Sequence, residues 1–85
     1  MTVFWTEFAK GKLDDIFEHY KLKARSANVA RKLVDSIVNH TLGLENQPYI
    51  GQKEELLSDR PQSFRYLVFK SYKIIYWINE LKKRI

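Results

Sequence analysis

The 85-residue sequence contains no cysteine, which excludes a disulfide framework, a thiol nucleophile and every thiolate zinc site. This absence suits a reducing compartment, so we expect a cytoplasmic protein. The three glycines, Gly11, Gly43 and Gly51, lie far apart, so the sequence has no glycine-rich phosphate loop. No apolar run approaches the ~20 residues of a membrane-spanning helix, and the N-terminus lacks the basic and apolar regions of a signal peptide. We therefore expect a soluble chain with no membrane partner.

The composition fits a single domain over residues 1–85, with 45% hydrophobic, 14% aromatic and 29% charged positions. Fifteen Lys and Arg against ten Asp and Glu give a net charge of +5. The excess is divided between the halves of the chain, so no charged tail is present. This balance suits an anionic partner such as RNA, DNA or an acidic polypeptide, and equally a solvated surface of mixed charge.

The first half of the chain has the apolar spacing of two amphipathic helices. A β-branched and aromatic segment at residues 2–5 predicts a short strand, and Thr6 is a good N-cap for a first helix. Ser26 or Asn28 can cap a second helix, and Gly43 suits the position just beyond its end. Because only a few residues join the two helices, they must run antiparallel.

The second half changes from helical to strand periodicity. Phe64–Phe69 and Tyr72–Asn79 are rich in β-branched and aromatic residues and are separated only by Lys70 and Ser71, which predicts a β-hairpin. A weaker strand is expected over Lys53–Leu56. Helices followed by an antiparallel sheet make an α+β fold, with a helical hairpin packed on a small sheet.

A tight turn at Lys70 and Ser71 divides the hairpin into two faces. One face pairs Phe69 with Tyr72, Leu67 with Ile74, and Arg65 with Tyr76, and we expect it to pack against the helices. The other face leaves aromatic rings and a cation where a sheet normally displays polar residues, so it is a binding surface or is covered by another segment. The residues that define this open face are Phe64, Tyr66, Lys73 and Trp77.

Most enzyme classes find no support in the sequence. His19 and His40 fall on different predicted helices without carboxylates at metal-binding spacing, so no metal or cofactor is expected. Asp14-Asp15 and Glu54-Glu55 are adjacent pairs whose side chains point apart, so they are interpreted as solvated charge rather than as paired catalytic carboxylates.

Basic and aromatic side chains remain in the second half. They could hold an RNA backbone while rings stack on its bases, or they could simply border the core. Cleavage of RNA without a metal would further need a base and an acid, and neither is visible. The set comprises Lys53, Arg60, Arg65, Tyr66, Lys70, Lys73, Tyr76 and Trp77.

The order of these elements resembles the RelE/ParE toxin superfamily of type II toxin–antitoxin (plasmid stabilisation) systems. The resemblance spans nearly the whole chain and depends most on Phe64–Val68 followed by Tyr72–Tyr76. It also includes Trp5-Thr6, Ala9, Leu13, Ile16 and Tyr20, the helical positions Ala30, Leu33 and Ile37, and the spacing of Pro48 and Gly51.

The resemblance implies a toxin that arrests growth by cutting mRNA at the ribosome or by poisoning DNA gyrase, and that a cognate antitoxin neutralises. In a metal-free endoribonuclease, phosphates would contact Lys53, Arg60, Arg65 and Lys73 while Tyr66 or Trp77 stacks on bases. A gyrase inhibitor would use an overlapping surface without proton transfer. The alternative is a non-toxic protein-binding module that keeps only the fold.

Residues 81–85 are interpreted as a turn followed by the first residue of one more strand that family members possess. We therefore expect the sheet to lack its last strand and to leave an edge open to a partner or to a second copy.

Overall fold

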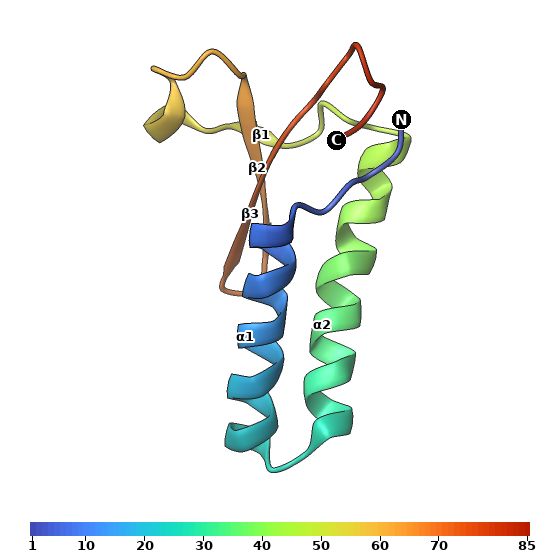
Figure 1. The fold of residues 1–85 in the computed structure, drawn as a ribbon, viewed down its shortest axis with the longest axis vertical. Coiled ribbons are helices and arrows are strands. Elements are labelled where there is room, and N and C mark those ends of the chain that lie inside the picture. The colour runs from blue at the N-terminus through green and yellow to red at the C-terminus, as the bar shows by residue number, and fades with distance from the viewer. The chain divides into compact units, whose positions relative to one another are not determined.

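The computed structural model describes residues 1–85 and divides them into two compact units. One unit contains Trp5–His40, and the other contains Met1–Phe4 together with Thr41–Ile85. The first holds the helices and the second holds a three-stranded antiparallel sheet, which confirms the α+β class (Figure 1).

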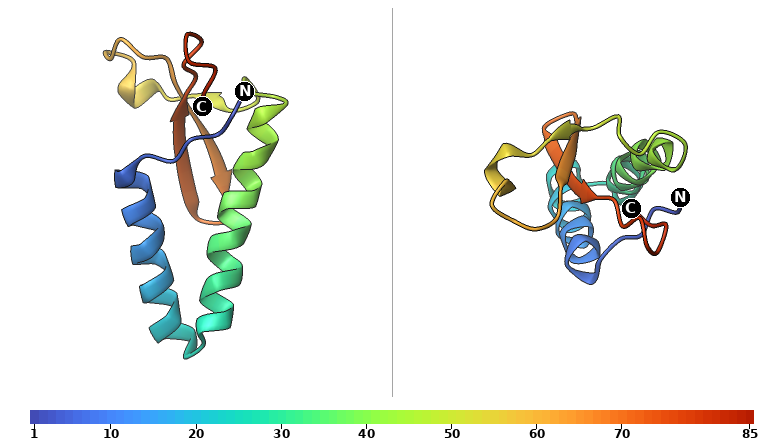
Figure 2. Two further views of the ribbon diagram at one scale, coloured as in Figure 1. Left: turned by 45° about the vertical axis from the view of Figure 1, so that its right-hand side comes forward. Right: turned by 90° about the horizontal axis from the view of Figure 1, so that it is seen from above.

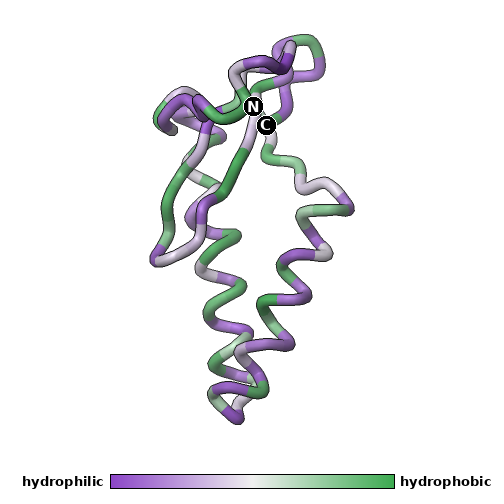
Figure 3. The backbone as a smooth tube through the Cα atoms, turned by 90° about the vertical axis from the view of Figure 1, so that its left-hand side faces the viewer, coloured by the Kyte–Doolittle hydropathy of each residue, from purple (hydrophilic) through white to green (hydrophobic).

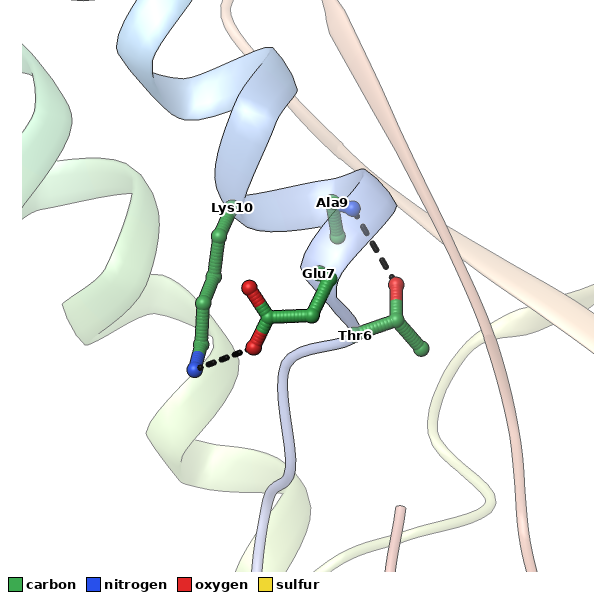
Figure 4. A network of polar contacts seen from close by, with 4 residues as sticks. All are labelled: Thr6, Glu7, Ala9 and Lys10. Carbon is green, nitrogen blue, oxygen red and sulfur yellow. Dashed lines mark hydrogen bonds and ion pairs between the residues drawn. The ribbon is translucent and has the colours of Figure 1, made fainter.

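The helical unit is built from α1, Glu7–Ala24, and from most of α2, Ala27–Leu42. Thr6 caps α1 as predicted, because its hydroxyl accepts a hydrogen bond from the Ala9 amide at 3.1 Å (Figure 4). The hydroxyl of Ser26 caps α2 in the same way, through the Val29 amide. Arg25, with a φ of 53°, ends α1 in the left-handed region and reverses the chain.

The two helices run antiparallel, as their short connection predicts (Figure 2). The Arg31 guanidinium of α2 lies over the Phe17 ring of α1, 5.1 Å from its centroid. Apolar and polar segments alternate along both helices (Figure 3). Neither helix has the length and apolar character needed to cross a membrane.

The sheet unit contains three strands in the order β1-β2-β3. They are β1, Gln52–Lys53, β2, Phe64–Phe69, and β3, Tyr72–Trp77. The β2–β3 register confirms the predicted pairs Phe69–Tyr72, Leu67–Ile74 and Arg65–Tyr76. The turn has two residues, and Lys70 adopts a φ of 54° there.

The core of the sheet unit is formed by Leu44, Tyr76 and Ile85. Val3, Leu67 and Ile78 pack against it, so the face that carries Tyr76 and Leu67 is the inner face of the hairpin. Leu44 belongs to a 3₁₀ helix, η1, over Gly43–Glu45. Gly43 was expected as a C-cap, but it has no positive φ because the chain tightens into this 3₁₀ turn instead.

Two strand predictions differ from the structure. The strand expected over Lys53–Leu56 ends at Lys53, and a second 3₁₀ helix, η2, follows at Glu55–Leu57. The Glu54 carboxylate accepts from the Leu56 amide and so turns the chain out of the sheet. At the N-terminus, Thr2 forms one bridge rather than a strand.

The ends of the chain meet beside Asn79. Arg84 bridges Thr2 in parallel and Asn79 in antiparallel orientation, after a turn that carries Lys83 at a φ of 52°. The amide of Phe4 donates to the Ile85 carbonyl at 2.8 Å. Over Tyr72–Trp77 itself, the outer edge of β3 has no neighbouring strand.

Candidate functional site

The outer face of the hairpin is apolar and exposed. Val68, Ile75 and Trp77 are 59%, 49% and 37% exposed, which is unusual for large side chains on a sheet. The register places all three on the same face as Tyr66 and Lys73. The open face of rings and a cation predicted from the sequence is therefore present.

Lys73 is held in place on this face by two neighbours. Its ammonium group lies 4.3 Å from the centroid of the Tyr66 ring and forms an ion pair with the Glu54 carboxylate. The Tyr66 hydroxyl donates to Gln52 at 2.9 Å. Lys73 and Tyr66 are thus brought together as expected, but the charge of Lys73 is already balanced within the chain.

Glu54 corrects the interpretation of Glu54-Glu55 as solvated charge. It is only 6% exposed and lies where β1 ends, while Glu55 is exposed. The hydrogen bond from Lys73 lowers the pKa of Glu54 below its ordinary value, and the Leu56 amide acts in the same direction. The charged carboxylate can be buried because a cation and a backbone donor both face it.

Arg65 lies on the inner face of the hairpin, apart from Lys73. Its guanidinium donates to the backbone carbonyls of Gly51 at 2.8 Å and of Tyr49 at 3.3 Å. It also stacks on the Tyr49 ring, with a centroid distance of 5.2 Å. Arg65 therefore fastens the loop at residues 48–51 to β2.

The sequence reasoning assigned no role to the hydroxyl groups of Tyr49 and Tyr76. Tyr76 donates to the Pro48 carbonyl at 2.8 Å and accepts from the Gly51 amide at 3.0 Å. Tyr49 donates to the Glu80 carboxylate, which raises the pKa of Tyr49. The Pro48 and Gly51 spacing was the only sequence signal for this loop.

Lys53 and Arg60 lie at a separate place, beside η2. Both residues line a hollow of about 220 Å³ that is formed within residues 53–64. Trp77 completes the predicted set on the outer face, where it pairs with Phe64 across the hairpin. The six predicted residues therefore lie in three separate places. The outer face carries Tyr66, Lys73 and Trp77, the loop at residues 48–51 is bound by Arg65, and the hollow is lined by Lys53 and Arg60.

The arrangement is suited to binding. The charged pair at the outer face is engaged internally, because the Glu54 carboxylate forms an ion pair with Lys73. What the face offers to a partner is an apolar and aromatic surface on a hairpin whose strands are joined by a two-residue turn.

A family model described as the ParE toxin of the type II toxin–antitoxin system parDE matches residues 3–85. No curated protein and no solved structure gives a significant match. Since the family match covers nearly the whole chain, including both helices and the hairpin, the chain belongs to the ParE family of type II toxins.

Proposed function

We propose that this toxin arrests growth by binding and inhibiting DNA gyrase, and that a cognate antitoxin neutralises it. The family match supports the gyrase target, since gyrase poisoning is the activity associated with ParE-like members. Cleavage of mRNA at the ribosome is the competing activity within the wider superfamily.

One observation carries the choice between them. Of the four cations that a ribonuclease would turn toward phosphate, the two on the hairpin, Arg65 and Lys73, are bound to acceptors of the chain itself, and the other two, Lys53 and Arg60, lie apart from them beside η2. Stabilisation of a phosphorane-like transition state requires cations that are directed at the developing charge. A surface that only has to bind its target requires no such groups, and it benefits from exposed rings and aliphatic side chains.

The contact surface proposed for gyrase is the outer face of the hairpin, with Val68, Ile75 and Trp77 as its apolar centre. Interface energy is concentrated in a few large side chains, among which Trp is over-represented. Trp77→Ala should therefore weaken inhibition at least tenfold. Leu22→Ala is the matched control, because Leu22 is an apolar side chain of α1 that is 75% exposed.

The test uses the chain made by cell-free synthesis, which avoids selection against a toxic product. Purified gyrase, relaxed plasmid and ATP are incubated with wild type, Trp77→Ala or Leu22→Ala, and supercoiled product is measured. Inhibition by wild type and Leu22→Ala, with weaker inhibition by Trp77→Ala, is the expected result.

A parallel culture separates the competing functions. Induced cells are followed for growth, and their RNA ends are mapped. Codon-phased mRNA cuts with unimpaired gyrase would replace the gyrase proposal by the ribonuclease. Normal growth with soluble, folded toxin would instead support the non-toxic binding module.

Self-association is part of the same proposal, through the outer edge of β3. An edge strand with unpaired backbone groups can accept a second copy. Sedimentation at rising concentration should detect a dimer, and Ile75→Lys should reduce it because a charge at an edge opposes pairing. A protein that stays monomeric at every concentration would contradict the proposed dimer.

A further inference from the structure

The chain from Lys53 to Phe64 forms a closed loop with a hollow inside it. The amide of Glu54 donates to the Phe64 carbonyl at 2.9 Å, so the two ends of the loop meet at the end of β1. Between them come η2 and a turn in which the Arg60 amide donates to Leu57 at 3.1 Å. Compact loops with closed ends often carry function.

The hollow is an open one and is lined by this one segment. All of its lining residues fall between positions 53 and 64, and its volume of about 220 Å³ is below the range of sites for drug-sized ligands. It can take a single phosphate with part of the attached sugar, but it is too small for a whole dinucleotide.

Two cations in the lining have no partner of their own. Lys53 and Arg60 are both exposed, and neither forms an ion pair, a side-chain hydrogen bond or a ring contact. In this they differ from Lys73 and Arg65, whose charges are engaged. Ser58 and Ser63 add hydroxyl donors to the same lining.

The carboxylates of the lining do not cancel these cations. Glu54 is neutralised by Lys73, so its charge is balanced from outside the hollow. Glu55 is the one acid of the lining without an ion-pair partner, and it sits at the start of η2. Within the lining, two unpaired cations therefore face one unpaired acid, Glu55, while Asp59 of the same loop lies outside the lining.

We propose that the hollow within residues 53–64 binds a phosphodiester group of a nucleic acid through Lys53 and Arg60. The planar guanidinium of Arg60 can bind two phosphate oxygens, and Lys53 adds a point charge. This site goes beyond gyrase binding, since it would let the toxin contact nucleic acid directly.

The test measures binding to nucleic acid without gyrase. Fluorescein-labelled twelve-nucleotide single-stranded RNA and twelve-base-pair DNA are titrated with the toxin, and anisotropy is read at several salt concentrations. Removing one phosphate-binding cation lowers the magnitude of the slope of log K against log salt by about 0.7 for a single strand and about 0.9 for duplex DNA. The double variant Lys53→Ala/Arg60→Ala should therefore lower it by about 1.4 or about 1.8, and the probe that binds more tightly identifies the source of the phosphate.

Two further variants make the result specific. Lys12→Ala/Lys32→Ala removes the same net charge from the helices and should leave the slope nearly unchanged. Glu55→Gln should tighten binding, because it removes the opposing charge from the hollow. Melting temperatures are measured for all variants; since neither Lys53 nor Arg60 has an internal side-chain contact, their replacement should not unfold the protein.

Equal slopes for the two double variants, or no binding by the wild type to either probe, would overturn the phosphate site. Such a result leaves gyrase inhibition standing, because the supercoiling assay reports on the outer face of the hairpin. Conversely, a toxin that binds nucleic acid through the hollow and leaves gyrase active would retain the site and lose the gyrase proposal.

Discussion

The Tyr76 hydroxyl accepts a hydrogen bond from the Gly51 amide at 3.0 Å and donates one to the Pro48 carbonyl at 2.8 Å. One buried phenol group therefore satisfies a donor and an acceptor of the same loop. It ties that loop to β3, which also carries the proposed gyrase surface on its other face.

Tyr76→Phe keeps the ring and removes both hydrogen bonds. We expect a decrease of about 1–3 kcal/mol in the free energy of unfolding, because the Gly51 amide is left buried without a partner. Urea denaturation followed by tryptophan fluorescence measures it. Tyr66→Phe is the control, since its hydroxyl bond to Gln52 is exposed and should contribute less than about 1 kcal/mol. Equal decreases for the two variants would mean that Tyr76 does not fasten the loop.

Position 51 requires glycine because neighbouring atoms leave no room for a Cβ atom there. A Cβ atom at this position would lie 2.5 Å from the Tyr76 hydroxyl oxygen and 2.8 Å from the Tyr66 carbonyl oxygen, and the latter cannot move without distorting β2. Gly51→Ala should therefore cost about 1–3 kcal/mol of stability, as overpacking does elsewhere. Gly11→Ala is the opposite case, because open space surrounds Gly11 in α1, and it should stabilise by about 0.5–1 kcal/mol. Both are read from urea midpoints.

The sequence was sufficient to predict those features that depend on residues close together along the chain. The caps at Thr6 and Ser26 and the complete β2–β3 register were predicted, because each is set by local chemistry or by the length of one turn. The contacts of Arg65 with the Tyr49 and Gly51 carbonyls join residues more than a dozen positions apart, so periodicity could not reveal them.

The wrong prediction for Glu54 has the same cause. Adjacent glutamates are usually solvated, and nothing near Glu54 in the sequence identifies Lys73 of β3 as its partner. The β1–β2 pairing brings the end of β1 beside the hairpin, and only then does Lys73 face the carboxylate. For the same reason, the sequence could not show which of the predicted cations bind acceptors of the chain itself and which do not.

Thr6 makes a contribution that can be measured in isolation. Thr6→Ala removes the acceptor for the Ala9 amide and should destabilise the chain by about 1 kcal/mol, whereas Thr6→Ser should retain the cap. Lys10→Ala, which breaks the exposed ion pair with Glu7 in the same turn, should change stability by less than about 0.5 kcal/mol. Thermal unfolding followed by circular dichroism separates these outcomes. A Thr6→Ser variant as unstable as Thr6→Ala would contradict the capping role.

The Glu54–Lys73 ion pair should make the free energy of unfolding depend on pH in the acidic range. Because the hydrogen bond from Lys73 lowers the pKa of Glu54 in the folded state, the unfolded chain binds the proton at a higher pH than the folded chain does. The contribution of Glu54 is therefore complete above its unfolded pKa and is lost as the pH falls through its folded pKa. Urea unfolding at a series of pH values from neutral to acid measures this slope.

Two variants identify the pair as its source. Glu54→Gln removes the titrating group, and Lys73→Met removes the first cause of its lowered pKa while keeping an aliphatic chain over Tyr66. Both should be less stable than wild type at neutral pH and should lose less stability on acidification. If Glu54→Gln instead followed the wild-type slope, other carboxylates would govern acid unfolding, and the ion pair would only hold η2 in position. A flattened slope in Glu54→Gln with an unchanged slope in Lys73→Met would assign the lowered pKa to the Leu56 amide, because that donor survives the removal of Lys73.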